Sequence, residues 1–338
     1  MKILITGTAG FIGFHLVKAL AAANHEIVGI DNINTYYDTG LKYGRLAATG
    51  IPREAISPLA MVQSSTLSCY RFIQMDLMDA SSINQLFAQE KFTHVCHLAG
   101  QAGVRYSITH PESYIESNVM GFLHILEACR HHGVKNLVYA SSSSVYGDNP
   151  DAPFSESDCT DYPVSLYAAT KKSNELMAHT YSKLYGIATV GLRFFTVYGP
   201  WGRPDMAPFK FLKSILEGKT IDVYNYGECR RDFTYIADIV EGIKRVLESA
   251  EPKQAGHHIY NIGCSHPVHL MEFIQTLEEV CGKTAQKQFL PLQPGDVPLT
   301  YADTTALERD FGYRPSVLLK EGLQEFCQWY RDYYKEEK

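Results

Sequence analysis

Tyr167 and Lys171 stand four residues apart, so on a helix their side chains would share one face. A run of serines, residues 141–144, directly follows an apolar segment that ends at Ala140. Such side chains suit the oxidation of an alcohol, because taking a hydride from a carbinol carbon requires the hydroxyl proton to leave as well. A tyrosine can accept that proton, a lysine can stabilise the phenolate, and a serine hydroxyl can hold the substrate oxygen.

This chemistry needs a tyrosine with a lowered pKa, since a phenol with a pKa of about 10 is a poor base at neutral pH. Lowering it by about three units needs roughly 4 kcal/mol, which a nearby ammonium or a positive nicotinamide ring can largely supply. Spacing alone says little, because Tyr334 and Lys338 match it in a charged tail. What separates Tyr167 is the serine run, which follows a predicted strand at the edge where parallel sheets bind ligands.

A glycine-rich loop, Gly7-Thr8-Ala9-Gly10-Phe11-Ile12-Gly13, joins the first predicted strand to the first predicted helix. Glycine permits the tight turn and lets backbone N–H groups approach a pyrophosphate, and the helix N-terminus adds its dipole. The glycine-rich heptad alone is weak evidence for a phosphate-binding loop. Its position between a predicted strand and a predicted helix indicates a dinucleotide site. Asp31 ends the second strand, where its carboxylate can accept both adenosine ribose hydroxyls and would repel a 2′-phosphate. NAD is therefore favoured over NADP, unless Asp31 only caps a helix or lies in a solvated loop.

These groups require a scaffold of alternating strands and helices, and the first half of the chain shows one. Apolar runs predict strands over residues 2–6, 26–30, 70–75, 94–98, 136–140 and 188–194, and helical patterns cover residues 11–23, 81–89, 114–132 and 167–185. Strands that are buried on both faces are almost wholly apolar, as these are. The alternation predicts an α/β fold with a Rossmann-like, doubly wound parallel sheet.

The pattern changes after about residue 196, where prolines crowd one loop and shorter elements follow. We expect an NAD-binding Rossmann domain over residues 1–196, to which residues 227–260 return, and a smaller C-terminal α/β substrate lobe made of residues 197–226 and 261–338. Residues 49–68 are polar and serine-rich, and a surface excursion is expected there.

Composition limits the class of protein. The chain of 338 residues carries a net charge of −6 at pH 7, so nothing favours a nucleic-acid partner. Its N-terminal apolar run is too short for a signal peptide, and no stretch approaches the roughly 18 apolar residues of a membrane span. The eight cysteines lie scattered without metal-like spacing. We expect a cytoplasmic enzyme with reduced thiols, no bound metal and no membrane partner.

The glycine loop, Asp31, the serine run with Val145-Tyr146-Gly147, and the Tyr167–Lys171 pair together resemble the extended short-chain dehydrogenase/reductase family of NAD-dependent epimerases and dehydratases. The resemblance runs from Lys2 to about Phe326. It implies a homodimer and a catalytic triad of Ser142, Tyr167 and Lys171. It also implies an NAD site made by Gly7, Gly10, Phe11, Ile12, Gly13, Asp31, Asn32, Asp76, Leu77, Leu98, Ala99, Gly100, Asn118, Tyr167, Lys171 and Phe194.

A narrower resemblance concerns the substrate. Residues 193–206 are similar to those of UDP-glucuronate 4-epimerases, and so is the segment 31–34 followed by residues 36–38 and 41–42. Thr196 stands where UDP-glucose 4-epimerases usually place asparagine, and Ser144 stands where UDP-glucuronate decarboxylases usually carry glutamate. The resemblance implies that Thr196 and Arg203 hold the sugar carboxylate. Arg203 could instead anchor its proline-rich loop by hydrogen bonds.

The family resemblance also points to groups that bind the nucleotide. Arg231 resembles a diphosphate ligand, although Arg230 and Arg231 must face opposite ways on a strand, so at most one should reach the ligand. Tyr224 is placed like an aromatic residue that stacks on uracil, but it could be a core residue. Asp296 lies in the segment where UDP-glucose 4-epimerases carry a second phosphate-binding arginine. The diphosphate contacts must therefore differ here, and Arg105 is a candidate replacement.

The expected function is NAD-dependent inversion at C4 of a UDP-sugar substrate, UDP-glucuronate to UDP-galacturonate, by transient oxidation to a 4-keto intermediate. Two alternatives remain open. One is a UDP-glucose or UDP-N-acetylhexosamine 4-epimerase, and the other is a catalytically silent protein that senses nucleotides on the same fold. Turnover with each sugar separates the enzymes, and absent turnover despite NAD binding would favour the sensor.

Overall fold

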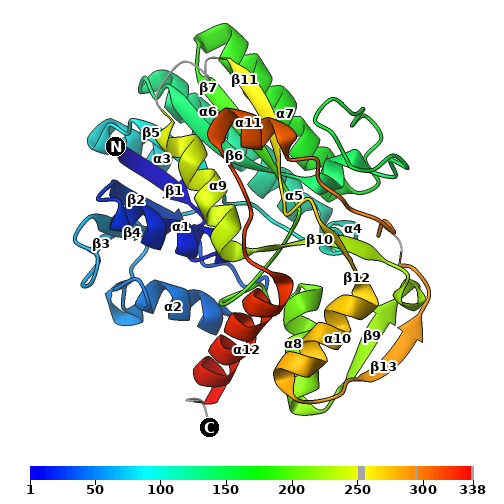
Figure 1. The fold of residues 1–338 in the computed structure, drawn as a ribbon. Helices are drawn as coiled ribbons and strands as arrows, with labels where there is room; N and C mark the ends of the chain where they lie inside the picture. Colours follow the sequence, from blue (N-terminus) through cyan, green and yellow to red (C-terminus); the bar gives the residue numbers. More distant parts are fainter. Residues whose placement is uncertain (250–255, 294, 336–338) are drawn as a thin grey trace.

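A computed structural model describes residues 1–249, 256–293 and 295–335, and its centre is an eight-stranded sheet (Figure 1). The strand order is β11-β7-β6-β5-β1-β2-β4-β3. These strands are β1 Lys2–Thr6, β2 Glu26–Asp31, β3 Met61–Gln63, β4 Tyr70–Gln74, β5 His94–His97, β6 Asn136–Ser142, β7 Ala188–Phe194 and β11 His257–Ile262. Every pairing is parallel except that of β3 with β4. From β1 the chain adds strands first on one side of the sheet (β2, β4, β3) and then on the other (β5, β6, β7, β11). Ligands bind at such a switch point in doubly wound sheets, and the predicted fold is confirmed.

Helices cover both faces of this sheet (Figure 1). On one face α1 (Phe11–Ala22) packs against α9 (Ile236–Glu248) over a shared apolar core. On the other face lie α3 (Ala80–Glu90), α6 (Gly121–His131) and α7 (Leu166–Tyr185) with a second core. α7 begins where the Ser165 hydroxyl accepts a hydrogen bond from the Ala168 N–H, and it ends at Gly186 with φ 67°. This start places Tyr167 in the first turn of α7.

A smaller lobe, built from segments before and after β11, has a core of its own. Its three-stranded sheet has the order β12-β10-β8, with β8 Thr196–Tyr198, β10 Arg230–Tyr235 and β12 Pro267–His269. A parallel pair, β9 (Thr220–Tyr224) and β13 (Gln286–Leu290), lies beside it. α8 (Ala207–Glu217), α10 (Leu270–Cys281) and α12 (Leu319–Lys335) pack together around Phe209, Phe273 and Phe326.

The remaining helices are short. They are α2 (Thr39–Ala47), α4 (Tyr106–Thr109), α5 (Pro111–Tyr114) and α11 (Thr305–Phe311). Among residues 1–249, 256–293 and 295–335, none of the helices is both long and apolar enough to cross a membrane.

The structure departs from the predicted elements in three places. The helix expected over 114–132 starts earlier, with Pro111 at the first position of α5, and passes through a π-helical turn, Ile115–Met120, before α6. Residues 49–68 are more than a surface excursion, because they supply β3 to the edge of the main sheet. The stretch 227–260 divides, since β10 joins the lobe whereas α9 and β11 join the main sheet. Lys338 lies outside the described residues.

Candidate active site

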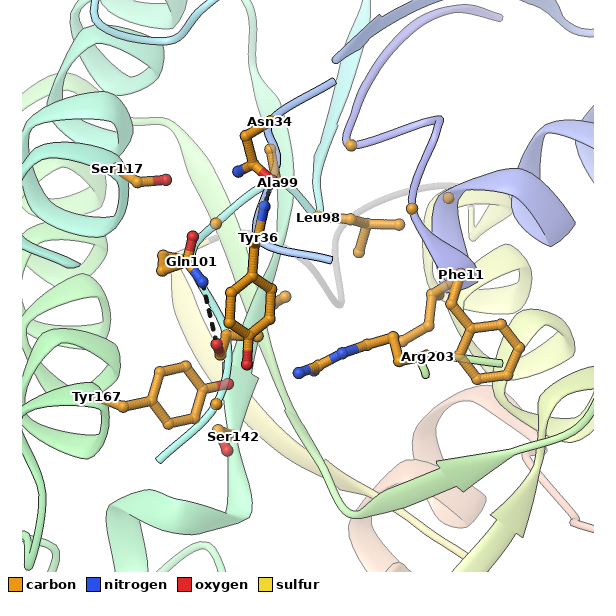
Figure 2. Close-up of a pocket in the computed structure, with 18 of the residues that line it drawn as sticks. Phe11, Asn34, Tyr36, Leu98, Ala99, Gln101, Ser117, Ser142, Tyr167 and Arg203 are labelled. Carbon is orange, nitrogen blue, oxygen red and sulfur yellow. Dashed lines mark hydrogen bonds between the residues drawn. The ribbon is translucent and has the colours of Figure 1, made fainter. Parts of the chain in front are cut away.

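A cavity of about 620 Å³ opens at the carboxyl ends of the parallel strands, between the main sheet and the lobe (Figure 2). Its size is typical of a small-molecule site. Most of the predicted site residues line it, namely Gly7, Gly10, Phe11, Ile12, Gly13, Asp31, Asn32, Asp76, Leu77, Leu98, Ala99, Gly100, Ser142, Tyr167, Lys171, Phe194, Thr196 and Arg203. The five that do not are Asn118, Arg105, Tyr224, Arg231 and Asp296.

The glycine loop is packed so closely that side chains would collide with backbone. Gly7 has φ 81°, and a Cβ there would lie 2.9 Å from the backbone nitrogen of Ala99. A Cβ at Gly13 would lie 2.2 Å from the carbonyl oxygen of Gly7. No side chain caps the N-terminus of α1 at Gly10, so its first N–H groups face the cavity. This cradle fits the pyrophosphate of a dinucleotide.

Asp31 is held at the tip of β2 by two backbone groups. Its Oδ2 accepts from the Ala9 N–H at 3.1 Å, and its Oδ1 accepts from the Ile33 N–H at 2.8 Å. Asp31 is thus the last residue of β2 and lines the cavity, with its carboxylate held by backbone groups. Lys42 lies nearby, and its Nζ donates to the backbone oxygen and the Oδ1 of Asn34. Burial lowers the pKa of Lys42, whereas the charge of Asp31 raises it.

The predicted catalytic residues meet at the end of β6. Ser142, the last residue of β6, accepts from the Ser144 N–H at 3.1 Å and donates to the Ser144 hydroxyl at 3.1 Å. The Lys171 ammonium donates to the Ala140 carbonyl at 2.9 Å, and burial lowers the pKa of Lys171 to about 8. Tyr167 lies one turn earlier on α7, and Ser142 lowers the pKa of its phenol.

Burial controls the acidity of the Tyr167 phenol in the protein alone. It raises the pKa of Tyr167 above the ordinary value, while the hydrogen bond with Ser142 and the charge of Arg203 lower it and Asp205 raises it. We expected Lys171 to contribute much of the lowering, but the protein's own groups do not overcome the loss of solvation. A further positive charge beside the ring is needed before Tyr167 can act as a base near neutral pH.

Arg203 faces the cavity and also anchors its loop. Its Nε donates to Asp205 Oδ1 at 3.1 Å, its Nη2 donates to Asp205 Oδ2, and the Tyr36 hydroxyl donates to the same Oδ2 at 3.0 Å. Figure 2 shows Arg203 and Tyr36 pointing toward the Tyr167 ring. The two interpretations of Arg203 are therefore compatible. Thr196, the first residue of β8, lines the same part of the wall.

The residues predicted to hold the nucleotide form a separate cluster. Arg105 donates to Asp296 at 2.7 Å, and its guanidinium lies 5.0 Å from the centre of the Tyr224 ring. Tyr224 is half-buried and so is not a simple core residue. Arg231 is half-buried and Arg230 exposed, and Arg231 donates to the carbonyl oxygens of Arg230, Val297 and Pro298. Arg231 is thus occupied by backbone acceptors.

Asn118 supports the wall of the site from behind. Its Oδ1 accepts from the Gln101 N–H at 2.7 Å, and its Nδ2 donates to the Gln101 carbonyl at 3.0 Å and to the Thr170 hydroxyl at 3.1 Å. These bonds tie the loop after β5 to α7. A Cβ at Gly100 would lie 2.9 Å from the Asn118 Oδ1, so this loop also needs glycine.

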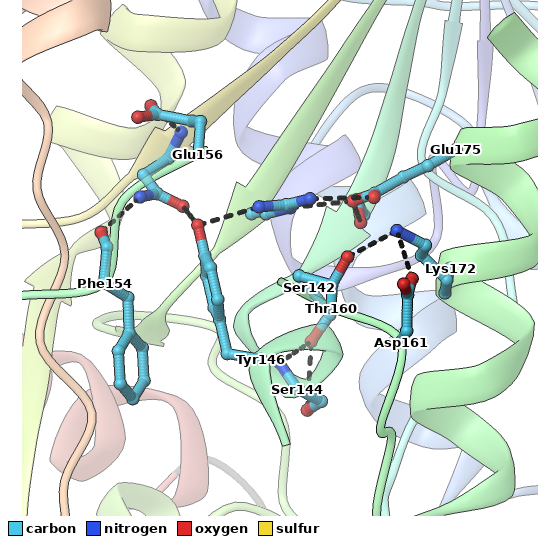
Figure 3. A network of polar contacts seen from close by, with 12 residues as sticks. Ser142, Ser144, Tyr146, Phe154, Glu156, Thr160, Asp161, Lys172 and Glu175 are labelled. Atoms are coloured by element: carbon cyan, nitrogen blue, oxygen red, sulfur yellow. Dashed lines mark hydrogen bonds and ion pairs between the residues drawn. The ribbon is translucent and has the colours of Figure 1, made fainter. Parts of the chain in front are cut away.

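A buried polar network fixes the strand end that carries the serines (Figure 3). Glu175 on α7 accepts from the Ser141 hydroxyl at 2.6 Å and from Arg193 Nε and Nη2, each at 2.9 Å. Arg193 Nη1 donates to the Tyr146 hydroxyl, which donates in turn to Asn261. The network thereby joins α7, β6, β7 and β11.

Several wall residues were not singled out by the sequence pattern. Tyr36, Asn34, Lys42 and Gln101 line the cavity. A faint signal existed for the first three, since residues 31–42 form part of the stretch that resembles one group of epimerases. For Gln101 there was none. Within the described part of the chain, no group of three or more His, Cys, Asp or Glu side chains could hold a metal ion.

Comparisons with known proteins agree with this geometry. The model of the NAD dependent epimerase/dehydratase family matches residues 3–263. Protein CapI of Staphylococcus aureus is 50% identical, over 99% of this chain and 100% of its own. UDP-glucuronate 4-epimerase 2 of Arabidopsis thaliana is 44% identical, over 99% of this chain and 77% of its own. The crystal structure of the UDP-glucuronic acid 4-epimerase of Bacillus cereus, in complex with UDP-glucuronic acid and NAD, superposes with a TM-score of 0.88 at 35% identity, covering 99% of this chain and 100% of that chain.

Proposed function

The chain belongs to the NAD dependent epimerase/dehydratase family, and we propose that it inverts C4 of UDP-glucuronate to give UDP-galacturonate. One observation carries this proposal. A single cavity places the Tyr167 phenol and the Ser142 hydroxyl beside a free edge of Arg203. The first two suit an alcohol under oxidation, and the third suits a carboxylate on the same sugar.

The residues of the chain divide the work of the reaction. Ser142 holds the O4 hydroxyl, Tyr167 takes its proton and later returns it, and Lys171 keeps a positive charge behind the phenol. NAD, when bound in the glycine cradle beside Asp31, supplies the hydride acceptor and donor together with the positive ring that Tyr167 needs. The sugar turns in the cavity before the proton is returned, so the product has the opposite configuration and no net oxidation occurs.

The glucuronate substrate carries a hazard, because its 4-keto form is a β-keto acid. Carbon dioxide leaves most easily when the bond to the carboxylate stands perpendicular to the carbonyl plane. Arg203 and Thr196 donate from one wall and hold the carboxylate away from that geometry. Ser144 supplies no carboxylate of the kind that decarboxylases of this family usually place there.

Further proposals concern the nucleotide. We propose that the main sheet with its helices (residues 1–196 and most of 227–260) holds NAD, and that residues 197–226 and 261–338 hold the UDP moiety. The cluster of Arg105, Tyr224 and Asp296 offers an aromatic ring and a cation for the uracil and diphosphate. Arg231 would reach the diphosphate only after leaving the carbonyl oxygens of residues 297 and 298.

We propose a homodimer built on the helices around α6 and α7. Large apolar side chains are exposed there, with Leu176 at 58% and Leu184 at 65% on α7 and Ile115 at 44% just before α6. Such a patch favours association with a second copy. All eight cysteines are free thiols, which fits a reducing compartment, and we place the enzyme in the cytoplasm.

The test is incubation of the purified protein with UDP-glucuronate, followed by chromatographic separation of the sugar products. We expect UDP-galacturonate to accumulate to an equilibrium mixture without net consumption of NAD. Parallel incubations use UDP-glucose and UDP-N-acetylglucosamine. Faster conversion of either neutral sugar would favour the alternative epimerases, and no conversion of any sugar would favour a nucleotide sensor.

A further inference from the structure

Asp205 accepts hydrogen bonds from the Nε and Nη2 edge of the Arg203 guanidinium and leaves the Nη1 side unbound by the residues that the structure describes. The two parallel bonds, from Nε to Oδ1 and from Nη2 to Oδ2, form the fork-to-fork pair that fixes a guanidinium plane. In the described part of the chain no protein acceptor binds Arg203 Nη1, and Arg203 lines the cavity. The side chains of Arg203 and Asp205 are 24% and 22% exposed, so the pair is partly shielded from water.

Tyr36 fixes Asp205 from the other side. Its hydroxyl donates to Asp205 Oδ2 at 3.0 Å, across 169 residues of chain. The Tyr36 ring packs 4.7 Å from the Tyr106 ring, and a Cβ at Gly103 would lie 2.5 Å from the Tyr36 hydroxyl. The loop after β2, the loop after β5 and the loop before α8 therefore meet at this carboxylate.

The pair also acts on the base. The charge of Arg203 lowers the pKa of Tyr167, and the charge of Asp205 raises it. Asp205 therefore cancels part of the effect of Arg203 on the pKa of Tyr167. The other groups that face Tyr167 are Ser142 on β6, Tyr114 on α5, whose ring centre lies 6.1 Å away, and Lys171 on the same helix. None of these contacts Asp205 through a hydrogen bond in the described residues.

We propose that Asp205 and Tyr36 are positioning residues that act through Arg203, and that they set the selectivity for a sugar carboxylate. The inference rests on the proposed function and deepens it. Asp205 holds the guanidinium so that Nη1 presents its N–H groups to the carboxylate, and Tyr36 holds Asp205. A loosely held arginine would lose rotamer freedom on each encounter, which weakens binding and misplaces the sugar.

The decisive experiment is a double-mutant cycle between Asp205→Asn and Arg203→Ala. In the unmodified background Asp205→Asn should lower kcat/KM for UDP-glucuronate by about tenfold or more. In the Arg203→Ala background it should change kcat/KM by less than about twofold, because the group it positions is gone. Tyr36→Phe, a milder change that removes only one hydroxyl, should lower kcat/KM by about threefold. Affinity for UDP, which has no sugar, should be unchanged in all of them.

A second readout is the pH profile. Because Asp205 raises the pKa of Tyr167 through its own charge, Asp205→Asn should move the acidic limb of kcat/KM to lower pH with or without Arg203. This shift reports the charge of Asp205 at the phenol, whereas the positioning role is reported by the coupling between the two substitutions in kcat/KM. Equal effects of Asp205→Asn on the plateau value of kcat/KM in both backgrounds, or an equal loss of UDP binding, would overturn the proposal.

The chain contains a matched control far from the cavity. Arg309 donates from Nε and Nη2 to Asp310 at 2.8 and 2.9 Å, and the Tyr260 hydroxyl donates to Asp310 Oδ2 at 2.9 Å. Asp310→Asn disrupts the same hydrogen bonds between an arginine, an aspartate and a tyrosine. It should leave kcat/KM and its pH profile unchanged.

Failure of the proposed function can be told apart from failure of this inference. If only a neutral UDP-sugar turns over, the proposed substrate is wrong, and the double-mutant cycle is measured on the dissociation constant of UDP-glucuronate relative to UDP. If no sugar turns over, the same cycle is measured on the dissociation constant of UDP-glucuronate relative to UDP. Additive effects in that cycle reject the inference.

Discussion

At Tyr167, burial and hydrogen bonding act on the phenol in opposite directions, and burial is the stronger. The residue therefore stays protonated near neutral pH until positive charge arrives beside its ring. Arg203 already lowers the pKa of Tyr167, so the group that we propose to bind the carboxylate would also assist the base. At the scale of single residues, substrate recognition and proton transfer are coupled.

Tyr167→Phe removes the ionisable oxygen and keeps the ring. Turnover should fall by about 10² or more, because the group that we propose to take the proton is lost, while NAD affinity stays near normal because the ring remains. Steady-state kinetics and a cofactor titration measure the two quantities. As a control, Tyr334 on α12 stands four residues before a lysine, as Tyr167 does. Tyr334→Phe should change neither turnover nor NAD affinity. Near-normal turnover of Tyr167→Phe would mean that another group carries the proton.

Asp31→Ala removes the carboxylate at the tip of β2. We expect weaker NAD binding and a narrower gap between NAD and NADP, since repulsion of a 2′-phosphate is lost. The nearby Lys42 ammonium remains and should favour the phosphate further. Dissociation constants for both cofactors check this. Equal affinity of the unmodified protein for NAD and NADP would contradict the assignment of Asp31.

Arg203→Ala removes the cation that we assign to the sugar carboxylate. The cost for UDP-glucuronate should be about 2–4 kcal/mol in transition-state terms, since the pair would be largely desolvated. Catalysis on a neutral UDP-hexose should suffer less. A trace of UDP-pentose is also expected, because a loosened carboxylate can reach the perpendicular geometry. Chromatography of the products shows this, and a folded variant with unchanged kinetics and no pentose would leave Arg203 as a loop anchor only.

At the scale of elements, the ion pair between Glu175 and Arg193 joins α7 to β7 beneath the serine run, residues 141–144. Both side chains are about 5% exposed or less, and Glu175 also binds Ser141. A buried pair of this kind contributes little net stability, but it is costly to break, because the remaining charge is left without a partner. Its role in this fold is to fix where β6 ends relative to the Tyr167 helix.

Glu175→Gln should therefore lower the free energy of unfolding by about 3–5 kcal/mol, since it leaves the Arg193 charge buried. Urea unfolding of the NAD-free protein measures the change. Glu241→Gln, which breaks an exposed pair with Arg245 at 49% and 44% exposure, should cost less than about 1 kcal/mol. A loss at Glu175 no larger than that at Glu241 would mean that water reaches Arg193 and replaces the carboxylate.

At the scale of the whole molecule, the apolar surface of α7 predicts association. Leu176→Glu combined with Leu184→Glu should convert a dimer into a monomer, because two charges would be buried at the interface. Sedimentation of both proteins gives their masses. Leu318→Glu, at a site 66% exposed just before α12, should leave the dimer intact. A monomeric unmodified protein would remove the basis for the proposed interface.

The amino-acid sequence by itself determined the fold class and most of the cofactor wall. The glycine loop, Asp31 and the Tyr167–Lys171 pair depend on local spacing, and the strands depend on local apolar runs. Such features can be predicted because the groups that act together lie within one turn or one strand–helix unit. To place Ser142 with Tyr167 and Lys171, the end of β6 must also be predicted to lie beside α7. This prediction follows from the rule that parallel sheets bind ligands at the carboxyl ends of their strands.

Only the tertiary structure decided what holds Arg203 and what surrounds Tyr224. Tyr36 meets Asp205 across 169 residues, and Arg105 meets Asp296 across 191. No periodicity in the chain encodes such pairs, because they depend on how three loops and a separate lobe close over the sheet. The tertiary structure also decided the pKa of Tyr167. Loss of solvation is a property of the closed cavity, and it outweighs the contributions of Ser142 and Arg203 that lower the pKa of Tyr167.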